Sequence, residues 1–445
     1  MARLFGTDGV RGIANKELTC SLAYRIGKAA TQVLSTGKQK KPLFLIGLDS
    51  RISGDMLQSA ITAGILSEGG DVMQLGVLPT PSVAYLVRKY NAAAGIMISA
   101  SHNPAEYNGI KIFSGNGFKL PDETEDEIER LTNSTMLPTS SRIGIIRPSG
   151  NAVRNYIDFL KSTVPRDFQG ISIALDCANG ATSHIAEAVF AELGATVCVT
   201  ANEPNGLNIN HNCGSTHPET ICEFTKKSGS HIGISFDGDG DRVLFSDETG
   251  TPVDGDQILA ILAKNMQKNG TLKRNTVVST VMSNFGLTLF GEQNGIHIKQ
   301  TNVGDRYVLE KMLQSGYNLG GEQSGHIILL DHNTTGDGIL TALQVVTTLM
   351  QTATPLSTLA RTLTKLPQVL INARVKNENK ELVLKNEAVL ELVENITIKL
   401  FRKGRVLVRP SGTEPLFRVM IEGENPEEIQ QYAKQIATLI EETFS

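Results

Sequence analysis

Hydrophobic and polar positions follow one rhythm that occurs three times along the chain. Each time, an apolar run of strand length leads into a short polar turn, a helix-like stretch, a glycine-containing turn and a second apolar run. The three leading runs are Leu43–Leu48, Ile171–Leu175 and Thr276–Val281, more than 100 residues apart. Strands alternating with helices in this way predict β-α-β units, and hence mostly parallel sheets covered by helices. We therefore expect three similar α/β domains rather than a short-period repeat.

The C-terminal stretch has a different pattern. Leu363–Val375 and Arg405–Ile421 flank the helix-like segment Glu381–Leu392, and a last helix is predicted to begin near Asn425. Asn425 is a suitable N-cap residue. The proline after it, at the first helical position, and Glu428, at the third, also favour a helix that begins here. This pattern predicts a smaller α+β domain, and we expect linkers at 138–150 and 352–355.

Charge and composition exclude several classes of protein. The 42 Lys and Arg residues nearly balance the 46 Asp and Glu residues, so the net charge of −4 offers no broad basic surface for nucleic acid or an anionic membrane. The five cysteines are an odd number without a C-x-x-C pair, which indicates reduced thiols. No apolar signal segment opens the chain, and no run of 18 apolar residues occurs. We expect a soluble, cytoplasmic protein.

The strongest chemical signal is the segment Asp237-Gly-Asp239-Gly-Asp241, which follows a strand-like run. The intervening glycines let the chain curl so that three carboxylates converge, and such hard oxygen donors suit Mg²⁺. An EF-hand is the rival interpretation, because Glu248 occupies the twelfth position of such a loop. That interpretation fails, since Arg242 stands where an EF-hand needs glycine and both flanks look like strands.

A second signal is the segment Ser99–Pro104, after the apolar run Ala92–Ile98. Ser101 at the end of a strand, with His102 beside it, could be an exposed nucleophile, although adjacency of serine and histidine alone is weak evidence. No G-x-S-x-G segment occurs, which argues against a hydrolase of that type. Taken alone, Lys111 is more often a solvated surface charge.

Two further segments offer binding groups. Gly320–His326 places hydrogen-bonding side chains between glycines and suits a polyhydroxyl ligand, although a polar turn is an equal alternative. Arg409–Pro415 and Arg418 combine guanidinium groups with hydroxyls and flexible backbone N–H groups, which favours a phosphate. A nucleophile, a metal triad, a hydroxyl-rich loop and a phosphate cradle together indicate phosphoryl transfer on a phosphosugar.

These segments, together with Phe5–Gly12, resemble the motifs of the α-D-phosphohexomutase family over essentially the whole chain. The resemblance implies an α/β fold in which three similar domains with mixed, mostly parallel sheets and a smaller C-terminal α+β domain surround an active site in a central cleft. The predicted domains are residues 1–150 with the phosphoserine loop, 151–252 with the metal loop, 253–366 with the sugar-binding loop and 367–445 with the phosphate-binding loop.

The resemblance also implies roles for individual residues. Ser101 would carry the phosphoryl group as phosphoserine and share Mg²⁺ with Asp237, Asp239 and Asp241. His102, Lys111 and Arg242 would be the other catalytic residues. The implied substrate-binding residues are Arg11, Glu322, Ser324, His326, Arg409, Ser411, Gly412, Thr413 and Arg418.

The sugar loop and the segment Thr301–Val308 look like the amino-sugar branch of the family, which interconverts glucosamine 6-phosphate and glucosamine 1-phosphate. We expect a glucosamine or glucose 1,6-bisphosphate intermediate, and a place in the supply of UDP-N-acetylglucosamine for cell-wall precursors. Glucose or mannose phosphates as the main substrate, and a non-enzymatic sugar-phosphate sensor, are the rival hypotheses. The only partner expected is the small phosphosugar, and the sequence leaves a homodimer open.

Overall fold

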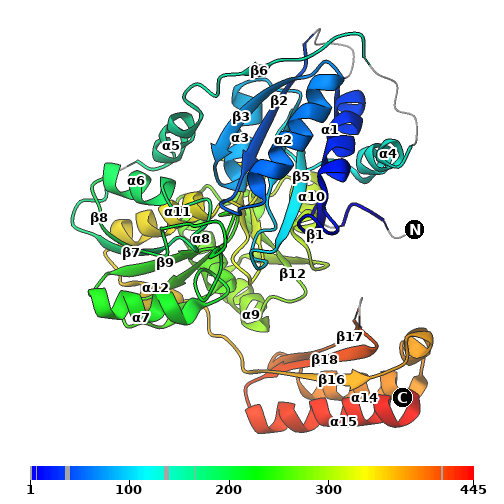
Figure 1. The fold of residues 1–445 in the computed structure, drawn as a ribbon. Helices are drawn as coiled ribbons and strands as arrows, with labels where there is room; N and C mark the ends of the chain where they lie inside the picture. Colours follow the sequence, from blue (N-terminus) through cyan, green and yellow to red (C-terminus); the bar gives the residue numbers. More distant parts are fainter. Residues whose placement is uncertain are drawn as a thin grey trace. The chain divides into compact units, whose positions relative to one another are not determined.

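The computed structural model describes residues 3–6, 8–35, 41–134, 140–165, 167–411 and 414–444. They form four sheets in two compact units (Figure 1). One unit contains the residues up to 282 together with 299–362, and the other contains 283–298 together with those from 363 onward.

The first sheet has six strands in the order β1-β5-β4-β2-β3-β6. Strands β4, β2, β3 and β6 are parallel, whereas β5 is antiparallel to both of its neighbours. The elements of this region are β1 (Val10–Ile13), α1 (Cys20–Leu34), β2 (Leu43–Leu48), α2 (Gly54–Ser67), β3 (Asp71–Val77), α3 (Thr80–Lys89), β4 (Ala94–Ile98), β5 (Tyr107–Ser114), α4 (Asp122–Thr132) and β6 (Ile146–Arg147).

Alternation along β2 explains how helices cover both faces of this sheet. Phe44 and Ile46 belong to the core formed with α1 and α2. Gly47 faces α3, where a Cβ would lie 2.7 Å from Val83 Cγ2. The first of the two predicted linkers, 138–150, is partly wrong, because Ile146–Arg147 pairs with β3 as the edge strand β6.

The second sheet has the order β11-β10-β9-β7-β8 and is parallel across β9-β7-β8 and antiparallel at β10 and β11. Its elements are α5 (Ala152–Ser162), β7 (Ser172–Asp176), α6 (Ile185–Glu192), β8 (Thr196–Thr200), α7 (Pro218–Ser228), β9 (Ile232–Phe236), β10 (Val243–Ser246) and β11 (Pro252–Val253). Both strands predicted beside the aspartate loop are therefore present, as β9 and β10.

The third sheet has the order β13-β12-β14-β15. Its elements are α8 (Gly255–Lys268), the 3₁₀ turn Lys273–Asn275, β12 (Thr276–Thr280), α9 (Phe285–Asn294), β13 (His297–Thr301), α10 (Asp305–Ser315), β14 (Leu319–Gly321), β15 (Ile327–Leu329), α11 (Gly338–Thr352) and α12 (Leu356–Ala360). The side chain of Asp254 accepts a hydrogen bond from Gln257 N, which forms a capping box at the start of α8.

The fourth sheet is antiparallel, in the order β16-β18-β17, and lies in the second unit. Its elements are β16 (Gln368–Arg374), the 3₁₀ turn Asn377–Asn379, α13 (Lys380–Val383), α14 (Glu387–Lys399), β17 (Gly404–Pro410), β18 (Leu416–Gly423) and α15 (Pro426–Phe444). Asn425 Oδ1 accepts hydrogen bonds from the backbone N–H groups of residues 427 and 428, so the predicted cap is confirmed.

The single helix predicted at Glu381–Leu392 is wrong. The segment is broken between α13 and α14, where the side chain of Asn386 accepts a hydrogen bond from Val389 N at 3.0 Å and starts the second helix. The larger architecture is confirmed: three α/β regions with mixed sheets precede a smaller α+β region. All five cysteines are free. Among the described residues, no helix is both long and apolar enough to span a bilayer.

Candidate active site

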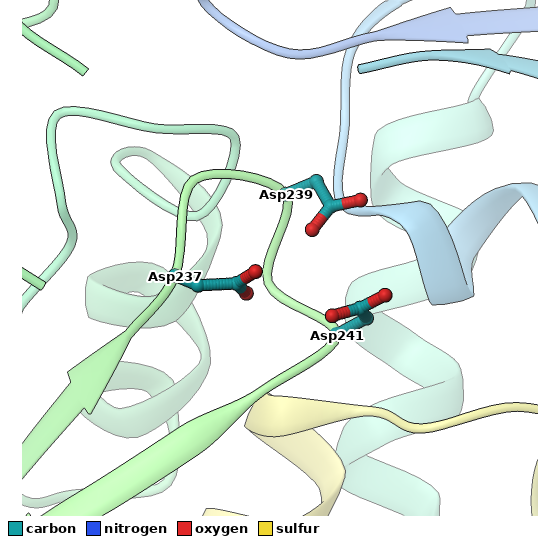
Figure 2. A group of neighbouring side chains, drawn as sticks. All are labelled: Asp237, Asp239 and Asp241. Carbon is teal, nitrogen blue, oxygen red and sulfur yellow. The ribbon is translucent and has the colours of Figure 1, made fainter. Parts of the chain in front are cut away.

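Three buried carboxylates converge in the loop between β9 and β10. Ligand oxygens of Asp237, Asp239 and Asp241 all lie within 4.8 Å of one another, and Figure 2 shows the loop curling around them. Gly240, with φ of +70°, makes the turn that brings Asp241 back toward Asp237. Burial, together with the charges of Asp239 and Asp241, raises the pKa of Asp237 well above its usual value.

Ser101 lies directly against this triad. It follows β4 and is 1% exposed, so the interpretation of Ser101 as an exposed group is wrong for this structure. Its Oγ donates a hydrogen bond to Asp237 Oδ2 at 2.5 Å. Its φ of +52° is in the left-handed region, which costs a serine roughly 1–3 kcal/mol. Such strain persists only where surrounding contacts impose it, and it often marks a functional residue.

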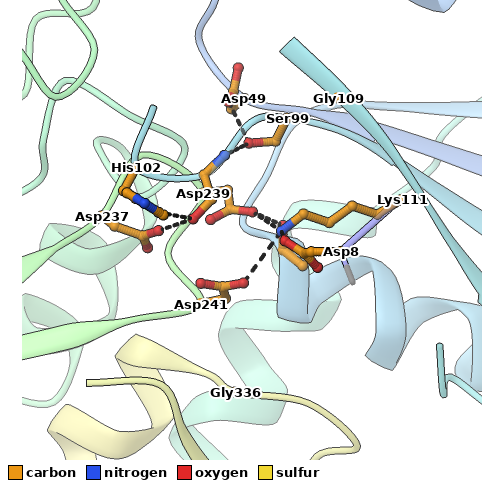
Figure 3. A network of polar contacts seen from close by, with 12 residues as sticks. Asp8, Asp49, Ser99, His102, Gly109, Lys111, Asp237, Asp239, Asp241 and Gly336 are labelled. Atoms are coloured by element: carbon orange, nitrogen blue, oxygen red, sulfur yellow. Dashed lines mark hydrogen bonds and ion pairs between the residues drawn. The ribbon is translucent and has the colours of Figure 1, made fainter. Parts of the chain in front are cut away.

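Lys111 is buried, not a solvated surface charge as its position alone suggested. Its Nζ lies 2.9 Å from Asp239 Oδ2, 3.4 Å from Asp241 Oδ2 and 3.0 Å from Asp8 Oδ2 (Figure 3). Burial by itself would lower the pKa of Lys111, but these three carboxylates raise it well above its usual value. Lys111 therefore keeps its positive charge and offsets part of the charge of the triad.

The network around Lys111 continues into the third sheet region. Lys119 Nζ binds Asp8 Oδ1 at 2.6 Å and Asp305 Oδ2 at 2.5 Å, and Arg11 also pairs with Asp8. His326 connects the two ends of the network, since Nε2 lies 3.6 Å from Asp305 Oδ2 and Nδ1 lies 3.6 Å from Asp241 Oδ1. Predicted site residues from all three α/β regions thus meet at the triad.

His102 and Arg242 flank Ser101 and the triad. His102 Nδ1 lies 3.4 Å from Ser101 Oγ, and burial, followed by the charges of Arg242 and Arg11, lowers the pKa of His102 to about 4. The imidazole is therefore neutral near pH 7 and can accept a proton. Arg242 donates its backbone N–H to Asp237 Oδ1 at 3.1 Å, and its Nε lies 4.0 Å from Asp241 Oδ1.

Glu322 and Ser324, two of the predicted substrate-binding residues, differ in their surroundings. Glu322 Oε1 accepts the backbone N–H of Gly304 at 3.1 Å, just before α10 begins. Ser324 is exposed at the tip of the loop between β14 and β15.

The triad fits a divalent cation. Asp239 Oδ2 accepts hydrogen bonds from Thr80 Oγ1 at 2.5 Å and from Lys111 Nζ at 2.9 Å. Asp239 Oδ1, in contrast, is buried and accepts no hydrogen bond, which is costly unless a cation binds it. An all-oxygen ligand set favours Mg²⁺ over zinc, which prefers nitrogen and sulfur ligands.

The predicted phosphate cradle lies in the second unit. Arg409 and Arg418 stand directly opposite each other on β17 and β18. Burial, followed by the charge of Arg418, lowers the pKa of Arg409. Like charges in this register are destabilising unless an anion binds between them. Glu414 offsets one of them, through Oε2 at 3.1 Å from Arg418 Nη2.

Ser411 is part of the same loop, and Lys380 Nζ holds it by donating hydrogen bonds to Ser411 O at 2.6 Å and Glu414 O at 2.7 Å. Glu414 N donates to Ser411 Oγ at 3.2 Å. Gly412 and Thr413 lie outside the described residues.

Several residues of the site were not predicted from sequence: Asp8, Asp49, Arg51, Thr80, Lys119, Asn210 and Asp305. Most of their contacts are with residues far along the chain, so local patterns assigned them no role. Asp8 and Asp305 nevertheless lie within the family-like segments Phe5–Gly12 and Thr301–Val308. For Asp49 and Arg51 the available signal was the polar turn at the end of β2, because ligand sites form at the carboxyl ends of parallel strands.

Gly238→Ala is expected to weaken Mg²⁺ binding. A Cβ at residue 238 would lie 2.6 Å from Ser101 O and 2.8 Å from Asn210 Nδ2, so the loop would have to move away from Ser101. Overpacking of this kind typically costs about 1–3 kcal/mol of stability. Gly229→Ala is the control, because its Cβ would meet nothing within 4 Å and only its φ of +65° is unfavourable. Calorimetric titration with Mg²⁺ separates the two; equal affinity in both variants would contradict the expected displacement.

Comparison with family models covers most of the chain. Residues 2–138, 154–250 and 254–366 match alpha/beta/alpha domains I, II and III of the family described as phosphoglucomutase/phosphomannomutase. Residues 370–439 match the C-terminal domain of the same family.

Similar proteins and structures extend over the full length. A phosphoglucosamine mutase from Clostridium botulinum (strain 657 / Type Ba4) is 54% identical over 446 residues, with 99% of each chain covered. The crystal structure of a phosphoglucomutase/phosphomannomutase family protein from Burkholderia thailandensis has a TM-score of 0.83 at 21% identity, and 99% of this chain and 97% of that one are covered. The structure of Aspergillus fumigatus N-acetylphosphoglucosamine mutase in complex with GlcNAc-6P and magnesium has a TM-score of 0.70 at 17% identity, covering 99% and 96%. Both structures share the fold of this chain.

Proposed function

The chain belongs to the phosphoglucomutase/phosphomannomutase family, and we propose that it catalyses the reaction of a phosphoglucosamine mutase, the interconversion of glucosamine 6-phosphate and glucosamine 1-phosphate. The observation that carries the reaction type is the hydrogen bond from Ser101 Oγ to Asp237 Oδ2, at the edge of a buried carboxylate triad. The choice of substrate is supported by the full-length relative that is 54% identical and bears that name.

Ser101 is the group that gives and takes the phosphoryl group in this proposal. In the first step the bond from phosphorus to Ser101 Oγ breaks and a bond from phosphorus to the free sugar hydroxyl forms. The hydroxyl proton passes to a base, and Ser101 Oγ leaves as a hydroxyl by taking up a proton. The 1,6-bisphosphate that results turns over in the site. Its other phosphoryl group then returns to Ser101 Oγ, and the isomeric monophosphate leaves.

Charge neutralisation is the main task of the surrounding residues, because phosphoryl transfer depends on positioning and electrostatics. Mg²⁺ held by Asp237, Asp239, Asp241 and a phosphoserine oxygen would neutralise charge on the transferring group. The raised pKa of Lys111 supports a role as a permanent cation near that group rather than as a proton acceptor.

The proton acceptor in our proposal is His102. Its pKa of about 4 keeps the imidazole neutral at neutral pH, and Nδ1 lies 3.4 Å from Ser101 Oγ. A general base has to lie within reach of the reacting oxygen and be unprotonated at the working pH, so His102 would take the proton of Ser101 Oγ when the phosphoryl group returns to it. His326, in contrast, has a raised pKa despite its burial, because Asp241 and Asp305 face it. It supports the carboxylate network instead.

Sugar and distal-phosphate binding complete the proposal. Arg11, Glu322, Ser324 and His326 would contact the substrate, in keeping with the family resemblance. The paired guanidinium groups on β17 and β18 support a role in holding the phosphate that is not reacting, together with the loop that begins at Ser411.

Arg409→Ala is expected to lower kcat/KM by roughly 10- to 100-fold. Loss of one hydrogen bond to a charged group costs about 1.5–3 kcal/mol, and about 1.4 kcal/mol corresponds to a factor of ten. The contact would exist in both the ground state and the transition state, so the change should appear mainly as a raised KM. Arg402→Ala, an exposed arginine of the same unit, is the control. Steady-state kinetics in which both variants match the wild type would remove Arg409 from phosphate binding.

Comparison of kcat/KM on the 6-phosphates of glucosamine, glucose and mannose tests the proposed substrate. We expect glucosamine 6-phosphate to be preferred. A preference for glucose or mannose phosphate would replace the proposed substrate with that of a phosphoglucomutase or phosphomannomutase and leave the phosphoserine chemistry intact. No turnover of any of the three would contradict the proposed function.

A further inference from the structure

Both backbone polar groups of Ser101 are tied to one buried ion pair. The N–H of Ser101 donates to Ser99 Oγ at 2.9 Å, and Ser99 Oγ donates to Asp49 Oδ2 at 2.5 Å. The carbonyl of Ser101 accepts from Arg51 Nη2 at 2.9 Å, and Arg51 Nε binds Asp49 Oδ2 at 2.9 Å. The four residues form a closed ring of hydrogen bonds, part of which is drawn in Figure 3.

The other N–H groups of the Arg51 guanidinium donate hydrogen bonds to the loop that follows Ser101. Nη2 also donates to Asn103 O at 2.8 Å, and Nη1 donates to Tyr107 O at 3.0 Å and to Pro104 O. The Arg51 side chain is fully buried, and its hydrogen bonds go to these carbonyls and to Asp49. A guanidinium suits this task because its rigid fork of five N–H groups can reach several acceptors at once.

A third tie comes from the second sheet region. Asn210 lies between β8 and α7, and its Nδ2 donates to Ser101 O at 2.9 Å and to Asn103 O at 3.1 Å. The backbone N–H of Asn210 is itself fixed by Ala178 O at 2.9 Å. The carbonyl of Ser101 thus receives donors from two sheet regions, and its position depends on how they pack together.

We propose that Asp49, Arg51, Ser99 and Asn210 are positioning residues that hold Ser101 in its left-handed conformation and so aim Oγ at Asp237. This inference rests on the proposed function, because phosphoryl transfer is what the position of Oγ serves. Without these hydrogen bonds, Ser101 would relax toward negative φ, which an L-residue prefers, and Oγ would leave the triad. A displacement of about 1 Å can cost about 100-fold in rate.

Asn210→Ala and Ser99→Ala test the proposal with small changes of volume, and Arg51→Lys keeps the charge beside Asp49 while losing the fork. Asn318→Ala is the matched control, because Asn318 is a buried asparagine that ties Thr271 O at 2.9 Å in the third sheet region. We expect kcat to fall by roughly 100-fold in Asn210→Ala and Ser99→Ala, with KM within about twofold of the wild type. Asn318→Ala should keep the wild-type kcat, even where it lowers stability.

A second readout is independent of turnover. In crystal structures of Asn210→Ala and Ser99→Ala, we expect φ of Ser101 to become negative and the contact from Oγ to Asp237 to be lost. Retention of positive φ and of wild-type kcat in both variants would overturn the proposal, even if Arg51→Lys fails to fold. If the wild type does not interconvert hexose phosphates, the proposed function fails, while the conformation of Ser101 in the variants still tests the positioning role.

Discussion

Ser101→Ala is expected to lose essentially all mutase turnover, by roughly 10⁴- to 10⁶-fold, the scale on which removal of a nucleophile acts. The substitution removes the oxygen that carries the phosphoryl group, so the protein can neither donate a phosphoryl group to the sugar nor accept one from it. Folding should survive, because Ala178, Ala201 and Ala353 of the same chain adopt positive φ and the ties to the backbone of residue 101 do not use its side chain. Turnover of glucosamine 6-phosphate, with bisphosphate supplied, measures the loss.

Ser172→Ala is the control for this variant. Ser172 lies in β7, and the substitution removes only a hydroxyl that binds His231 outside the site. It should retain wild-type turnover. Wild-type turnover in Ser101→Ala would show that the phosphoserine mechanism is wrong.

Asp239→Asn is the second variant with a large expected effect. It keeps the size of the side chain but removes a charge that Lys111 Nζ and Thr80 Oγ1 contact, and it weakens the oxygen set for Mg²⁺. Mutation of residues that only orient metal ligands typically lowers metal affinity or activity by about 10- to 100-fold. We therefore expect loss of the charge of a ligand itself to lower turnover by about 100-fold or more. Chelation of the wild type should abolish activity, and added Mg²⁺ should restore it.

Mg²⁺ titration of turnover and of binding checks this result against Asp158→Asn, an exposed aspartate on α5. Asp158→Asn should match the wild type in both measurements. An unchanged Mg²⁺ dependence in Asp239→Asn would remove the triad from the proposed mechanism.

The aspartate loop could be predicted from sequence because its geometry is local. Three carboxylates spaced by glycines between two strands leave few ways for the chain to turn, so Asp237, Asp239 and Asp241 converge. The alternation of strands and helices could also be predicted, because strands and amphipathic helices differ in the spacing of their apolar residues. The predicted domain boundaries at 150, 252 and 366 stay a prediction.

The surroundings of the triad could not be predicted, because they arise from contacts between distant segments. Lys111 can be buried with its charge because Asp8, Asp239 and Asp241 face it, and all three lie more than 100 residues away along the chain. Arg51 is an ordinary turn residue in sequence, and its role becomes visible only when the loop after β4 folds back over it. Composition and spacing do not encode such pairings.

Intact-mass spectrometry with peptide mapping tests the central claim most directly. The active protein should carry one phosphoryl group, on Ser101. Each cycle returns the other phosphoryl group of the 1,6-bisphosphate to Oγ, so turnover of glucosamine 6-phosphate that carries ¹⁸O in its phosphate should leave Ser101 phosphorylated with the label. A dephosphorylated form of the protein should regain the group on incubation with the bisphosphate. Full mutase activity in a protein that is never phosphorylated at Ser101 would contradict the account.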